Sequence, residues 1–119
     1  MRTALPALLL ALSWIVLVTL PPPAAGHEGG PDPVAVRVVI VTMFEIGEDT
    51  GDQAAEFQLW YERRNLDQVY AFPGHHDLHF DPETGLLAMV TGIGTAKAAT
   101  SVALLGMDPR FDLSKAYWL

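Results

Sequence analysis

The stretch that decides the fold is AMVTGIGTAKAATSVALLGMD, residues 88–108. Gly92-Ile93-Gly94 joins an apolar, partly β-branched run, residues 86–91, to a run of good helix formers, residues 95–105. This order predicts a strand, a tight glycine turn and a helix. Such a turn leaves backbone N–H groups at the positive end of the helix dipole, where an anion or a hydroxyl-rich ligand is favoured. The turn suits ligand binding, but it could equally serve only to join the strand to the helix.

The glycine pattern alone is weak evidence for a ligand. It does not match a dinucleotide-binding loop, because Lys97 stands where the third glycine is required. Thr95 could simply cap the helix, and Lys97 is interpreted as a solvated charge rather than as a phosphate contact.

A second strand is predicted earlier in the chain, at residues 34–42. Its sequence, VAVRVVIVT, is almost continuously apolar with Arg37 as the only charge, which is typical of a strand covered on both faces in a parallel sheet. A loop with four carboxylates follows: Glu45, Glu48, Asp49 and Asp52.

A helix is predicted over residues 53–64, capped by Thr50 or Asp52. Several of its apolar side chains share one face and are interpreted as core, with stacking on a ligand base as the alternative. They are Ala54, Phe57 and Tyr61, with Trp60 beside them.

The remaining segments are expected as follows. Residues 65–81 read as irregular or edge-strand-like with a turn at residues 72–74, and residues 81–85 as a hairpin-type turn. The second helix buries a stripe and ends at a glycine cap, and a third strand begins in residues 111–119. The stripe and the cap are Ala98, Val102, Leu105 and Gly106.

This alternation of strands and helices predicts an α/β fold, a partial three-layer α/β/α sandwich with a mostly parallel sheet. Three strands and two helices do not cover such a sheet, so we expect residues 34–119 to be the N-terminal part of a longer, truncated domain.

The N-terminal residues predict export. Residues 1–26 combine a basic start, an apolar run of about 16 residues and a PPPAAG segment, as in a signal peptide cleaved after Ala25 or Gly26. An uncleaved anchor is the alternative, although the run is shorter than the roughly 20 residues of a membrane span. Residues 27–33 are expected to be a flexible lead-in. The cleaved protein is expected to be periplasmic or secreted and to have no stable membrane span.

Composition restricts the partners. The 119 residues carry a net charge of −7 and no cysteine. Nucleic acids and anionic membranes are therefore unexpected partners, and disulfides and thiolate metal sites are excluded.

Two acidic or histidine-rich segments invite a metal proposal. The acidic loop does not have the spacing of an EF-hand, and the histidines of HHDLH, residues 75–79, do not have that of a helical zinc pair. We expect no metal, and a surface or hydrogen-bonded role for His75, His76 and His79.

Three longer motifs carry a family resemblance: VVIVTMFEIGEDTGDQAAEFQLWYER, HDLHFDPETGLLAMVTGIGTAKAA and GMDPRFDLSKAYWL. Together they make residues 36–119 resemble the N-terminal part of the purine nucleoside permease family. That family is similar to the nucleoside phosphorylase and nucleosidase superfamily, which implies a phosphorylase-like three-layer fold that binds a purine nucleoside. The resemblance implies no cofactor, phosphate as a conceivable co-substrate, and an oligomer as an option for the full-length parent.

The resemblance also implies site residues. It places Thr42, Met43 and Glu45 in a loop after the first strand, beside the glycine turn, with Glu45 as the candidate catalytic carboxylate and a solvated carboxylate as the alternative. The ligand-binding residues of the turn would be Thr91, Gly92, Ile93, Gly94 and Thr95.

Three functional hypotheses follow from the resemblance. The first is nucleoside binding and transmembrane uptake. The second is cleavage of the N-glycosidic bond by the full-length parent, whose further glycine-rich stretch and purine-protonating carboxylate would lie beyond Leu119. The third is a truncated product without function.

Overall fold

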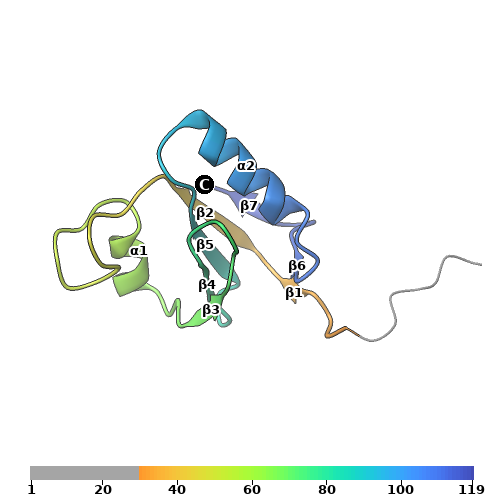
Figure 1. Ribbon diagram of the computed structural model, residues 1–119. Helices are drawn as coiled ribbons and strands as arrows, with labels where there is room; N and C mark the ends of the chain where they lie inside the picture. Colours follow the sequence, from red (N-terminus) through yellow and green to blue (C-terminus); the bar gives the residue numbers. More distant parts are fainter. Residues whose placement is uncertain (1–29) are drawn as a thin grey trace, which may run out of the picture. The chain divides into compact units, whose positions relative to one another are not determined.

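The computed structural model describes residues 30–119, of which residues 31–119 form one compact unit (Figure 1). The predicted signal peptide, residues 1–26, and the start of the predicted lead-in lie outside the described residues. Residues 30–33 precede the first strand without regular secondary structure.

Within residues 30–119, seven short strands form two sheets. The larger sheet has the order β3-β4-β5-β2-β7, and β1 pairs with β6 in a separate two-stranded sheet. The strands are β1 (Val34–Ala35), β2 (Val38–Thr42), β3 (Gln68–Tyr70), β4 (Leu78–Asp81), β5 (Leu86–Val90), β6 (Phe111–Asp112) and β7 (Tyr117–Trp118).

The larger sheet is mixed. Strand β2 runs parallel to both of its neighbours, β5 and β7, whereas β3, β4 and β5 are successively antiparallel. The α/β class is confirmed. The larger sheet is mixed rather than mostly parallel, because residues 65–81, expected to be irregular or edge-strand-like, contribute the antiparallel strands β3 and β4. The hairpin-type turn before β5 is confirmed, with Gly85 N donating to Asp81 O at 2.9 Å.

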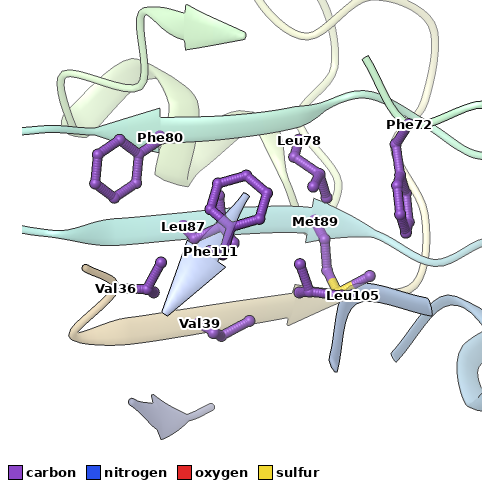
Figure 2. Close-up of a cluster of buried hydrophobic side chains, with 9 residues drawn as sticks. All are labelled: Val36, Val39, Phe72, Leu78, Phe80, Leu87, Met89, Leu105 and Phe111. Carbon is purple, nitrogen blue, oxygen red and sulfur yellow. The ribbon is translucent and has the colours of Figure 1, made fainter. Parts of the chain in front are cut away.

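Strands β2 and β5 are covered on both faces, as their continuous apolar sequences predict. On one face Val39, Leu87 and Met89 pack with Leu105 of α2 (Thr95–Gly106), which Figure 2 shows beside Met89. On the other face, buried side chains pack with Trp60 and Tyr61 of α1 (Gln58–Arg63). The buried members of that second cluster are Ile40, Phe57, Leu66, Leu86, Ala88 and Val90.

Several element boundaries differ from the predictions. Helix α1 begins at Gln58 rather than at residue 53, and neither Thr50 nor Asp52 caps it. Gly106 lies inside α2, whose cap is Met107. The predicted third strand is divided into β6 and β7 by a turn in which Ala116 N donates to Leu113 O at 3.1 Å.

The predicted strand over residues 34–42 is likewise divided. Its first part, β1, pairs with β6, and its second part, β2, pairs with β5 and β7. Within residues 30–119, no helix has the length and apolar character needed to cross a bilayer.

Candidate functional site

The carboxyl ends of β2 and β5 lie side by side. Thr42 is the register partner of Val90, and Thr91 N donates to Thr42 O at 2.8 Å. The loop after β2 and the glycine turn after β5 therefore start from the same edge of the sheet, as predicted. The hydroxyl of the buried Thr42 does not face a ligand, because it donates to Met89 O at 2.9 Å.

The glycine turn is built on two positive φ angles, +84° at Gly92 and +109° at Gly94. Gly94 is the N-cap of α2, and no side chain of residues 30–119 caps this helix. Thr95 therefore does not act as the cap that its position suggested. The amides of the first helical turn are left for a ligand or for solvent.

Lys97 bends back over the glycine turn. A methyl group placed on Gly92 would lie 2.9 Å from Lys97 Cδ and 3.8 Å from Nζ, so the aliphatic chain covers the Gly92 backbone. This conformation brings the ammonium group close to the turn, where it adds to the positive end of the helix dipole.

A cavity of about 300 Å³ opens beside this turn, and we call it the glycine-turn cavity. The volume is at the lower end of the range for small-molecule sites. The cavity is lined by Gly74, His75, His76, Thr91, Gly92 and Lys97. Of the predicted site residues, Thr91 and Gly92 line it. The other predicted site residues do not line this cavity: Thr42, Met43, Glu45, Ile93, Gly94 and Thr95.

A second cavity, of about 290 Å³, shares His76 with the first. We call it the hairpin cavity. One of its walls is His79, whose ring centroid lies 5.1 Å from that of Phe57 and 5.4 Å from that of Tyr61. His79 Nε2 is 3.8 Å from Asp49 Oδ2, which ties the acidic loop to β4. Residues 30–119 contain no group of three histidine, aspartate or glutamate side chains arranged to hold a metal ion.

The family follows from comparison with known proteins. The model of the family described as purine nucleoside permease (NUP) matches residues 35–119. The chain belongs to the purine nucleoside permease family. A probable purine nucleoside permease of Schizosaccharomyces pombe is 27% identical over 121 residues, which cover 92% of this chain and 31% of the relative. A purine nucleoside permease of Candida albicans is 29% identical over 83 residues, covering 70% of this chain and 19% of the relative.

The chain thus spans less than a third of the length of these curated family members. No solved structure shows significant similarity to it.

In this member of the permease family, Glu45 holds the loop after β2 in place. Its Oε1 accepts hydrogen bonds from the amides of Ile46 (2.9 Å) and Ala55 (2.7 Å). Its Oε2 accepts those of Phe57 (2.9 Å) and Gln58 (2.5 Å). Burial raises the pKa of the carboxyl, but the four backbone donors outweigh burial and hold its pKa below the usual range.

The structure therefore places Glu45 at the start of α1 as a cap supplied from outside the helix. A general base needs to take up a proton, which these donors disfavour. Met43 lies in the same loop, where its amide donates to Glu56 Oε2 at 2.6 Å and its side chain is exposed.

Sequence reasoning did not assign His75, His76 and Lys97 to the site of this permease-family chain. The histidines and the glycine turn are separated in the sequence by the β4–β5 hairpin, so no local spacing indicates that they meet. The sequence signal that could have pointed to His75 was the Phe72-Pro73-Gly74 turn. A turn that follows a strand places the next residue, here His75, at the end of the sheet.

Replacing Gly92 by alanine is expected to lower the free energy of unfolding by about 1–2 kcal/mol, because an L-residue at this positive φ is strained. The added methyl group would also displace Lys97 from the turn. Urea denaturation measures the change. Gly106→Ala is the matched control: this glycine is helical and has open space around it, so alanine should stabilise by about 0.5 kcal/mol. Equal effects of the two variants would contradict the strained turn.

Proposed function

We propose that the protein binds a purine nucleoside in the glycine-turn cavity and takes part in nucleoside uptake as a permease-like protein. The observation that carries this proposal is the position of the cavity at the carboxyl end of β5, which runs parallel to β2. Ligands of open α/β sheets bind at such an edge. The relatives from Schizosaccharomyces pombe and Candida albicans, named as a probable permease and a permease for purine nucleosides, supply the substrate class.

The chemistry of the cavity suits a nucleoside. The Gly92 backbone and the Lys97 ammonium group offer donors to sugar oxygens, and the imidazoles of His75 and His76 offer nitrogen acceptors. Ile93, Gly94 and Thr95 lie at the start of α2 and would approach a ligand that extends out of the cavity. The cavity-lining residues and these three residues carry the proposed sugar contacts. Phosphate is the alternative ligand beside Lys97.

A second candidate function is cleavage of the N-glycosidic bond by a longer, phosphorylase-like parent. The observation that favours it is that His75 and Lys97, a proton-transfer group and a cation, line the same cavity. In this alternative the sheet would belong to a phosphorylase-like three-layer sandwich, and phosphate or water would attack the sugar.

Calorimetric titration of the full chain with inosine tests the binding proposal. Lys97→Ala is expected to weaken inosine binding about tenfold, because one charge-assisted hydrogen bond is lost. Lys115→Ala, which removes an exposed lysine from the turn between β6 and β7, should leave the affinity unchanged. Equal affinities of the wild type and Lys97→Ala would exclude the glycine-turn cavity as the site.

Release of free purine distinguishes the two functions. Inosine incubated with the protein, with and without phosphate, should remain intact if the function is binding for uptake. Appearance of hypoxanthine that depends on the protein would favour glycosidic cleavage. A requirement for phosphate would separate phosphorolysis from hydrolysis.

A further inference from the structure

Ser101 is a fully buried polar side chain between two segments of the site. It lies in α2, and none of its surface is exposed. Its Oγ is 2.8 Å from His75 Nδ1 and 3.3 Å from the carbonyl oxygen of Thr91. One hydroxyl therefore links the histidine of the cavity to the residue that precedes the glycine turn.

The donor direction of the Ser101–Thr91 bond sets the direction of the Ser101–His75 bond. The Thr91 carbonyl can only accept, so the single Ser101 hydroxyl proton is donated to it. Ser101 Oγ then has only lone pairs left for His75, and Nδ1 has to be the donor. A neutral His75 held in this way carries its proton on Nδ1, which leaves Nε2 bare.

The position of the His75 ring is fixed from the backbone as well. Residues 72–75 form a tight turn in which His75 N donates to Phe72 O at 2.9 Å. Proline at the second position and Gly74 at φ +81° in the third are the pattern of a type II turn. The buried Phe72 ring lies with its centroid 5.1 Å from that of His75. The ring is thus held by the turn, by Phe72 and by Ser101 while it lines the cavity.

We propose that His75 presents a bare Nε2 to the glycine-turn cavity as a hydrogen-bond acceptor for a ligand hydroxyl, with Ser101 as its positioning residue. The nucleoside as the source of that hydroxyl rests on the function proposed above. A lone pair at this position accepts a hydrogen bond from a sugar hydroxyl and repels a fully ionised phosphate oxygen. His75 therefore favours a hydroxyl group over an unprotonated phosphate oxygen on its side of the cavity, whereas Lys97 favours an anionic oxygen.

The ligand-free protein provides the first test. Long-range ¹H–¹⁵N correlation spectra, recorded well above the ordinary imidazole pKa, report which nitrogen of His75 carries the proton. We expect the Nδ1–H form in the wild type. The Nε2–H form, which free imidazole side chains favour, should replace it in Ser101→Ala. Thr100→Ala removes a hydroxyl from the exposed, neighbouring position of the same helix and should keep the wild-type tautomer. A wild-type protein with His75 in the Nε2–H form would overturn the proposal.

Reaction with diethyl pyrocarbonate provides a second ligand-free test, because the reagent attacks an unprotonated imidazole nitrogen. Mass spectrometry should find His75 modified, and inosine should protect it. An unreactive His75 in the folded wild-type protein would show that Nε2 does not open into the cavity, and would also overturn the proposal.

Titration with inosine connects the tautomer to the ligand. His75→Asn keeps an amide near the Nδ1 position, within reach of Ser101, and removes the acceptor at Nε2. It should weaken inosine binding about tenfold, whereas Thr100→Ala should not change it. Unchanged affinity in His75→Asn would overturn the role of His75 in ligand binding. A wild-type protein that binds no inosine would instead refute the proposed function. The inference about His75 would then be tested by the two ligand-free measurements alone, the NMR tautomer and the reaction with diethyl pyrocarbonate.

Discussion

Replacing Leu105 by alanine is expected to lower the free energy of unfolding by about 3 kcal/mol, the largest effect of any variant considered. Leu105 is the apolar residue of α2 that is fully buried, and it packs with Val39 and Met89 of the sheet (Figure 2). Truncation removes apolar contacts and leaves a cavity that the neighbouring strands cannot fill. Urea denaturation followed by circular dichroism measures the loss.

Leu104 offers a matched control on the same helix. Its side chain is 39% exposed, so Leu104→Ala should change the free energy of unfolding by no more than about 0.5 kcal/mol. If the two leucine variants lose equal stability, α2 does not pack on the sheet through the Leu105 face. The glycine turn would then lack the support that places it beside β2.

Replacing Glu45 by alanine is expected to cost about 2 kcal/mol, at the upper end of the range for loss of a helix cap. Four backbone amides lose their acceptor at once, and the loop after β2 loses its attachment to α1. Glu45→Gln keeps the shape without the charge and should cost about half as much. Glu48→Ala is the control, because no side-chain hydrogen bond of Glu48 is found among the described residues. A Glu45→Ala variant as stable as Glu48→Ala would refute the capping role.

The contribution of Glu45 should depend on pH in a defined direction. Its pKa is lower in the folded protein than in the unfolded chain, so its stabilisation is complete above the ordinary glutamate pKa of about 4.5. Stability is lost as the pH falls through the lowered, folded-state value. The difference in unfolding free energy between the wild type and Glu45→Ala should therefore shrink below about pH 4.5. A difference that grows with acid would have the opposite sign and would contradict the assignment.

The elements that could be predicted are those with a strong local signal. Strands β2 and β5 have continuous apolar sequences because both of their faces are buried, and α2 follows its glycine turn within one residue of the prediction. The antiparallel strands β3 and β4 are short and include polar residues, so their sequences do not distinguish a strand from a loop.

The start of α1 could not be predicted because a residue far from it decides where the helix begins. Helix propensity favours residues 53–57, yet the Glu45 carboxylate binds the amides of Ala55 and Phe57 and holds this segment outside the helix. Such a contact depends on how the loop folds back, which composition and periodicity do not report.

Only part of the candidate site could be predicted, again because the rest depends on contacts between residues that are far apart in the sequence. The family resemblance implied that the loop after β2 lies beside the glycine turn, and the parallel register of Thr42 with Val90 confirms it. The approach of His75 to the same turn depends on the β3–β4 hairpin and on Ser101, a buried serine in a helix that looks unremarkable in sequence.

The pairing of β2 with β7 has a consequence for biosynthesis. Strand β2 is among the first elements to leave the ribosome, yet one of its two edges stays open until residues 117–119 arrive, when Leu119 N donates to Val39 O at 2.9 Å. During translation the nascent chain can assemble β2 to β5 and α2, but the edge of β2 that faces β7 stays unpaired through that interval. Exposed strand edges recruit other chains, so the open edge of β2 is a site of unwanted association until β7 pairs with it.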